Sequence, residues 1–89
     1  MNSTAAWNVI IDSDVNKQLR RVPKKDAGRI FTAITDMVAN PYSGDVVRMR
    51  GEEDVWRRRV GAYRIFYEVL PKEKTVYVYR VERRTSTTY

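Results

Sequence analysis

The chain has 89 residues, of which 43% are hydrophobic and 31% are charged, with a formal net charge of +6. This length predicts one domain, because two separate cores would each be too small to be stable. The sequence contains no cysteine and no histidine, which excludes disulfides, thiolate or imidazole metal ligands, and catalysis by an ordinary imidazole. No apolar stretch approaches the ~20 residues of a membrane span, and the N-terminus does not resemble a signal peptide. We therefore expect a single cytoplasmic domain over residues 1–89, without a membrane partner, a metal ion or another cofactor.

The first half of the chain predicts one strand followed by two helices. The apolar, β-branched stretch "WNVII" (residues 7–11) is typical of a strand, and "DSD" after it offers N-cap residues. Apolar residues then recur at helical spacing up to Pro23, namely Val15, Leu19 and Val22. A second helix is predicted over residues 24–39, and its apolar side consists of Ala27, Ile30, Phe31, Ile34 and Val38. It should end at Asn40, because a residue before proline disfavours the helical conformation.

Beyond Gly44 the hydrophobic period changes to two, which indicates strands. Three candidates follow, "VWRRRV", "AYRIFYEVL" and "TVYVYRV", separated by Gly61-Ala62 and by "PKEK". The order β-α-α-β-β-β predicts an α+β fold, in which two N-terminal helices pack on one face of a mainly antiparallel sheet.

The pair Gly61-Ala62 predicts a hairpin with a two-residue type II′ turn. Directly paired residues share a face of the sheet. One face of this hairpin should therefore carry Arg57, Arg59, Arg64, Phe66 and Glu68. The other face is apolar apart from Arg58, whose charge has to reach an edge or a carboxylate.

Placing Arg59 directly opposite Arg64 costs up to ~1 kcal/mol through like-charge repulsion, so folding alone does not explain it. A solvated outer face is one interpretation. A phosphate-binding surface explains the crowding better, because guanidinium groups offer planar, bidentate donors to phosphate oxygens. The basic residues are also concentrated in the strand-rich half, since residues 48–89 hold eleven Lys/Arg against six Asp/Glu.

The sequence resembles the RelE/ParE superfamily of bacterial toxins and, within it, the RelE-like mRNA interferases. The similarity lies in "WRRRVGAYRIFYEV", in the last strand "VYVYRV", and in the Arg-Arg pair before a terminal tyrosine. The resemblance implies the toxin of a type II toxin–antitoxin module, an endoribonuclease that cuts mRNA in the ribosomal A site through 2′-hydroxyl attack. It also implies a cognate antitoxin, with an acidic or amphipathic segment over the basic face, in a hetero-oligomer. The other implied partners are mRNA and ribosomal RNA.

The resemblance assigns the catalytic roles to Arg64, Arg84 and Tyr89. It assigns RNA or phosphate binding to Arg57, Arg59 and Arg83, with Arg83 as the alternative to Arg84. Phe66 shares the arginine face and is the aromatic residue best placed to meet a base. Arginine stabilises charge well but is a poor general acid, so positioning by the ribosome should dominate catalysis.

Two other functions stay open on the sequence. One is a ParE-like inhibitor of DNA gyrase, which is not an enzyme. The other is a basic RNA-binding module without catalysis. The set Arg64, Arg84 and Tyr89 favours the nuclease over the gyrase inhibitor, which has no need of it.

Overall fold

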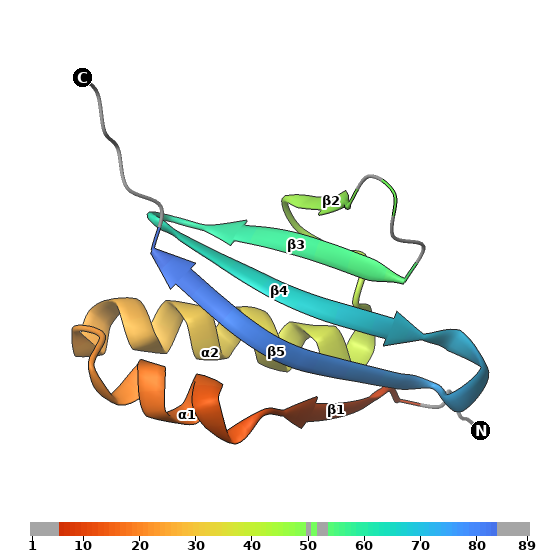
Figure 1. Cartoon of the computed structure of the whole chain (residues 1–89), viewed down its shortest axis with the longest axis horizontal. Helices are drawn as coiled ribbons and strands as arrows, with labels where there is room; N and C mark the ends of the chain where they lie inside the picture. Colours follow the sequence, from red (N-terminus) through yellow and green to blue (C-terminus); the bar gives the residue numbers. More distant parts are fainter. Residues whose placement is uncertain (1–5, 50, 52–53, 84–89) are drawn as a thin grey trace.

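Five strands form one sheet, and two helices pack on one of its faces (Figure 1). This structure, a computed structural model, describes residues 6–49, 51 and 54–83. The elements are β1 (Asn8–Ile11), α1 (Ser13–Arg20), α2 (Lys24–Ala39), β2 (Val46–Arg48), β3 (Val55–Val60), β4 (Tyr63–Leu70), the 3-10 turn η1 (Pro71–Glu73) and β5 (Thr75–Arg83). The predicted α+β class is confirmed, with the short strand β2 in addition to the predicted order.

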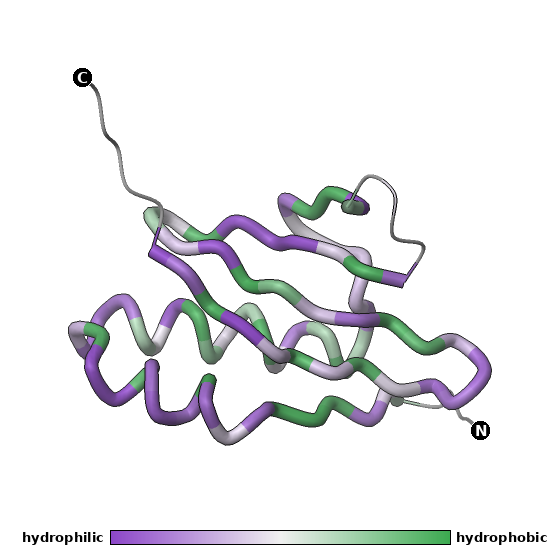
Figure 2. Tube along the Cα trace, viewed as in Figure 1, coloured by the Kyte–Doolittle hydropathy of each residue, from purple (hydrophilic) through white to green (hydrophobic). Residues whose placement is uncertain are grey.

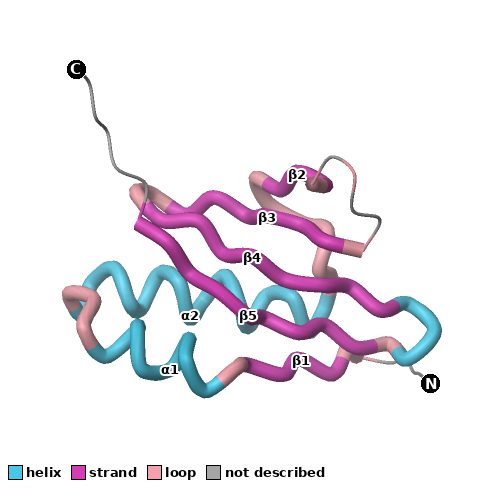
Figure 3. Tube along the Cα trace, in the orientation of Figure 1, coloured by secondary structure: helices cyan, strands magenta, loops and turns pink. Residues whose placement is uncertain are grey.

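The strands lie in the order β1-β5-β4-β3-β2 (Figure 3). Only β1 is parallel to its neighbour, β5, and the other three pairings are antiparallel. Among the described residues, neither helix combines the length and apolar character of a membrane span.

The two helices begin and end close to the predicted positions. Asp12 caps α1, because its carboxylate accepts a hydrogen bond from the Asp14 amide at 2.9 Å. Helix α2 has the predicted bounds, and Asn40 after it is extended, as its position before a proline favours.

The predicted apolar side of α2 was partly wrong. Phe31 and Val38 are 58% and 37% exposed. Ile30 and Ile34 are buried as predicted, and Ala33 and Met37 are the other residues of α2 that pack against the sheet. Because 3.6 residues make one turn, a rotation of the helix by less than half a turn exchanges one apolar stripe for its neighbour. The contact with the sheet selects the stripe.

The hydrophobic core lies between the helices and one face of the sheet. Apolar and polar residues alternate along β4 and β5 (Figure 2), so that each strand gives one face to the core. The innermost side chains are Val15, Ile30, Ile65, Tyr67, Val76 and Val78, each with no exposed surface. The opposite face of β3, β4 and β5 carries no helix, and we call it the open face (Figure 1).

The β3–β4 hairpin has the predicted register. Val60 pairs with Tyr63, Arg59 with Arg64, and Arg57 with Phe66. Gly61 has a φ of 58°, whereas Ala62 has no positive φ, as the type II′ turn requires.

Strand β5 contains an irregularity that the sequence did not reveal. Its register against β4 shifts between Phe66 and Tyr67, so that Phe66 pairs with Arg80 and Tyr67 with Val78. Such a bulge inserts one residue and reverses the alternation beyond it. Arg80 therefore lies on the open face. Without the bulge, strict alternation from the buried Val78 would have directed Arg80 into the core.

Candidate functional site

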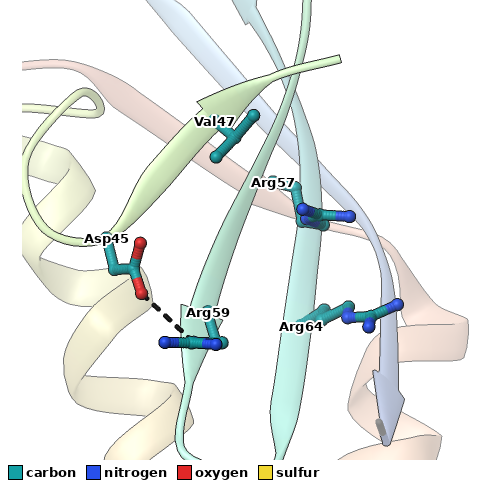
Figure 4. A pocket seen from close by; sticks show the side chains of 5 residues that line it. All are labelled: Asp45, Val47, Arg57, Arg59 and Arg64. Carbon is teal, nitrogen blue, oxygen red and sulfur yellow. Dashed lines mark ion pairs between the residues drawn. The ribbon is translucent and has the colours of Figure 1, made fainter. Parts of the chain in front are cut away.

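Three arginines line one pocket on the open face of the sheet (Figure 4). This arginine pocket has a volume of about 330 Å³ and is lined by Asp45, Val47, Arg57, Arg59 and Arg64. The residues come from the loop before β2 and from β2, β3 and β4. The three predicted phosphate-contacting residues of the hairpin are thus brought together.

The pairing of the strands explains this convergence. Arg59 and Arg64 are direct cross-strand partners, and Arg57 lies two residues before Arg59 on the same face. On the other side of β3, Val47 pairs with Arg57, so that β2 forms a wall of the pocket. The fold therefore accepts like-charge repulsion to hold three guanidinium groups at one place.

A carboxylate also lines the arginine pocket, and sequence reasoning missed it. Asp45 Oδ2 lies 3.2 Å from Arg59 Nε, and its backbone carbonyl accepts a hydrogen bond from the Arg59 amide at 2.9 Å. Both side chains are more than half exposed, so the ion pair contributes at most ~1 kcal/mol to stability. The signal in the sequence was weak, because β2 has only three residues.

Phe66 lies on the predicted face but is buried, with only 6% of its surface exposed. The Arg80 guanidinium covers the ring, with its carbon 4.5 Å from the ring centroid. This is a favourable cation–π contact. A contact between Phe66 and an RNA base stays a prediction, and it requires Arg80 to move away from the ring.

Arg58 is directed toward the helices, and its contacts explain how a charge is held on the core face. One of its terminal nitrogens donates to the carbonyl of Ala33 at 3.2 Å, and the other lies 3.5 Å from an Asp36 carboxylate oxygen. A Cβ added to Gly44 would lie 2.7 Å from the guanidinium carbon. Arg58 therefore joins β3 to α2 and leaves little room for a side chain at position 44, where a φ of 88° also favours glycine.

The C-terminal candidates are not all described. Arg83 is the last residue of β5, pairs with Tyr63 and is exposed, but it does not line the arginine pocket. Arg84 and Tyr89 lie outside the described residues, so their catalytic roles stay predictions.

Two tyrosine hydroxyls have perturbed acidity. Burial raises the pKa of Tyr67 to about 12, and the nearby Arg58 charge opposes this shift. The Tyr77 hydroxyl donates to the Asp12 carboxylate, which raises the pKa of Tyr77 and lowers that of Asp12. Both groups join elements of the fold, and neither lines the arginine pocket.

Comparisons with known proteins agree with this architecture. Residues 9–87 match the family model described as the ParE toxin of type II toxin–antitoxin system, parDE. A Methanocaldococcus jannaschii protein named "Putative toxin RelE1" is 28% identical over 81 residues, which is 88% of this chain and 90% of that protein.

Solved structures share the fold. The archaeal RelE–RelB complex from Pyrococcus horikoshii has a chain with a TM-score of 0.81 and 26% identity, over 92% of this chain and 99% of that one. The isolated E. coli RelE toxin has a TM-score of 0.79 over 92% of this chain and 88% of that one, and its identity of 18% supports the fold alone. Because the family model spans most of the sequence, this chain belongs to the ParE toxin family of type II toxin–antitoxin systems, in the RelE/ParE superfamily.

Proposed function

We propose that this chain is a ribosome-dependent endoribonuclease that cuts mRNA, and that the arginine pocket binds the scissile phosphate. The observation that carries the proposal is the convergence of Arg57, Arg59 and Arg64 on one pocket. Arg59 and Arg64 are paired directly despite their repulsion. A bound phosphate removes that repulsion, because it places negative charge between the guanidinium groups.

Arg64 has the central role in this mechanism. Cleavage without a metal ion uses the 2′-hydroxyl of the RNA as the nucleophile, and negative charge develops on the phosphoryl oxygens in the transition state. Fixed guanidinium donors stabilise that charge, and the loss of one such donor typically costs 10²–10³ in rate, or roughly 3–4 kcal/mol. Arg59 is held by Asp45 at 3.2 Å, so a phosphate oxygen entering the pocket replaces that carboxylate.

Tyr89, Arg84 and Arg59 share the remaining roles in the proposed cleavage. Tyr89 is the proposed base for the 2′-hydroxyl, because the cationic residues that precede it in the sequence, Arg83 and Arg84, favour its phenolate form. Arg84 assists at the phosphate. As the 2′-oxygen bonds to phosphorus and the bond from phosphorus to the 5′-oxygen breaks, Arg59 stabilises the leaving 5′-oxygen through its charge, and water supplies the proton that this oxygen takes up. Since no arginine readily gives up a proton, cleavage depends on the ribosome holding the message in line.

A cognate antitoxin is the proposed physiological partner, in a hetero-oligomer. The net charge of +6 and the arginine pocket favour an acidic or amphipathic segment as the element that covers the open face. The related Pyrococcus protein was solved as a RelE–RelB complex, which supports this assignment.

Inhibition of DNA gyrase is the second candidate function. The match to a family model favours this function, because the description of that model names the ParE toxin and not RelE. A non-enzymatic inhibitor has no need of a phosphate pocket, so this function predicts that Arg64 contributes little.

Induction of the protein in cells, with translation and DNA breaks measured together, tests the proposal. The wild type is compared with Arg64→Ala and with Lys72→Ala, which removes one exposed charge outside the pocket. We expect rapid translation arrest and cut messages for the wild type and for Lys72→Ala. Arg64→Ala should lose the cleavage by at least ~10²-fold.

Purified ribosomes programmed with a defined message give the direct readout. Cleavage only in the presence of ribosomes supports the proposal. Double-strand DNA breaks with intact messages would instead establish gyrase as the target. Equal activity of Arg64→Ala and the wild type would refute the role of the arginine pocket.

A further inference from the structure

A second basic groove runs beside the open face, between α1 and the last part of β5. Strand β1 pairs only with residues Thr75 to Val78, so that α1 lies beside the remainder of β5. Gln18 fixes this arrangement, because its side-chain oxygen accepts a hydrogen bond from the Val81 amide at 3.3 Å. We call this feature the α1–β5 groove.

The α1–β5 groove consists of two adjacent hollows of about 410 and 260 Å³. Both are lined by Gln18 and Arg21. The larger one also contains Lys17, Arg80, Asp14 and the ring of Tyr79, and the smaller one contains Arg83. Four cations therefore line the groove against one carboxylate.

The helix dipole favours cations at the end of α1, where Lys17 and Arg21 lie, but it does not require them to share one side of the helix. Lys17 and Arg21 lie four residues apart on the same side of the helix end, a spacing at which like charges cost about 0.2–0.5 kcal/mol. Both side chains are exposed and line the same hollow. As in the arginine pocket, like charges are gathered around a concave surface where a bound anion would remove their repulsion.

Arg80 connects the two basic regions. It lines the α1–β5 groove, and its guanidinium also lies over the ring of Phe66, which pairs with Arg57 of the arginine pocket. Adjacent strands are about 4.8 Å apart, so β3 and β5 are separated by ~10 Å. An RNA strand bound in the arginine pocket can therefore continue across β5 into the groove.

We propose that the α1–β5 groove is a second RNA-binding site, in which Lys17 and Arg21 each hold a backbone phosphate outside the scissile position. This proposal rests on the proposed ribonuclease function. The shared chemistry is an RNA phosphate, and its source is either the message or ribosomal RNA. Arg80 is less available as a donor, since it is paired with Glu82 at 2.9 Å.

The test measures RNA affinity as a function of salt for the full chain. The variant Lys17→Ala/Arg21→Ala is compared with Lys25→Ala/Lys72→Ala, which removes the same charge from exposed positions outside the groove. The probes are a short single-stranded RNA with 2′-O-methyl groups, which cannot be cut, and ribosomes without a message. Far-UV circular dichroism and the thermal midpoint check folding, and Lys17→Gln/Arg21→Gln serves as a second variant.

Each lost phosphate contact lowers the slope of log affinity against log salt by about 0.7 for single-stranded RNA. If Lys17 and Arg21 each neutralise one phosphate, the slope falls by about 1.4. Salt weakens the RNA binding of both proteins. When the salt is raised from about 50 to 200 mM, the factor by which the affinity of the variant falls is then about seven times smaller than the factor for the wild type. The control variant should keep the wild-type slope.

A reduced slope with the oligonucleotide identifies the message as the ligand, and a reduced slope with ribosomes alone identifies ribosomal RNA. Equal slopes for the groove variant and the control, with both probes, would overturn the proposal. The proposed function fails separately, because it is refuted when Arg64→Ala still cuts messages. If that variant is inactive and the slopes are equal, the groove proposal alone is wrong.

Discussion

Replacing Tyr67 by phenylalanine removes one buried hydrogen bond that ties β4 to the loop after α2. The Tyr67 hydroxyl donates to the carbonyl of Pro41 at 2.7 Å, and both residues are fully buried. The substitution leaves that carbonyl without its partner and away from water, at a cost of about 1–3 kcal/mol. For a domain of this size each kcal/mol corresponds to about 4–8 °C, so we expect the thermal midpoint to fall by ~4–24 °C.

Tyr63→Phe is the matched control. Tyr63 is also a buried β4 tyrosine, 7% exposed, but its hydroxyl makes no hydrogen bond to another described residue. Urea denaturation followed by circular dichroism gives the free energy of unfolding for each variant. If Tyr67→Phe loses no more stability than Tyr63→Phe, the hydrogen bond to Pro41 makes no net contribution to the free energy of unfolding, which contradicts the expected cost of the unpaired carbonyl.

The pH dependence provides an independent check. Burial raises the pKa of Tyr67 from 10.0 to about 12. The unfolded chain therefore releases this proton at a lower pH than the folded one. The stabilisation is complete below pH 10 and is lost as the pH rises through 12, by roughly 3 kcal/mol at most. The wild type should accordingly lose its advantage over Tyr67→Phe in alkaline urea titrations, and a constant difference would contradict the assignment.

Substitutions at Gly44, Arg58 and Asp12 test other contacts. Gly44→Ala should lower the free energy of unfolding in urea by about 1–3 kcal/mol, because φ is 88° at this position and the new Cβ meets Arg58. Gly28 lies on α2 with open space around it, so Gly28→Ala should instead raise the free energy of unfolding by ~1 kcal/mol. Arg58→Ala should destabilise the fold by about 2 kcal/mol. Arg58→Met should destabilise it by clearly less, because methionine keeps the packed aliphatic part of the side chain. Equal losses of stability in the two variants would show that the charge of Arg58 matters more than its packing. Asp12→Ala should lower the thermal midpoint at neutral pH. Since the hydrogen bond from Tyr77 lowers the Asp12 pKa, that difference should vanish as the pH falls through the range where the carboxyl is protonated, and a difference that persists in acid would refute this origin.

The β3–β4 hairpin shows how far local sequence determines this structure. The glycine at position 61 and a hydrophobic period of two were sufficient to predict the turn, the register and the face shared by Arg57, Arg59 and Arg64. Each of these features depends on residues within a few positions of one another. The bounds of α2 were predicted for the same reason, since periodicity and the proline after Asn40 are local signals.

Asp45 shows where local information is insufficient. Its approach to Arg59 depends on the pairing of β2 with β3, and a strand of three residues leaves almost no periodic signal. Arg80 is a similar case, because only the bulge opposite Phe66 and Tyr67 directs it to the open face. A bulge depends on how two strands fit across the sheet, which composition does not record.

The amino-acid sequence was enough to predict the α+β class, the order of the main elements and the sheet face shared by Arg57, Arg59 and Arg64. The tertiary structure decided which stripe of α2 is buried, and it supplied the partners of Arg58. The Arg58 contacts with Ala33 and Asp36 join residues more than twenty positions apart. Such contacts follow from the packing of a helix against a sheet, where a small rotation changes every neighbour. Turns and periodicity are properties of adjacent residues, and for that reason they could be predicted first.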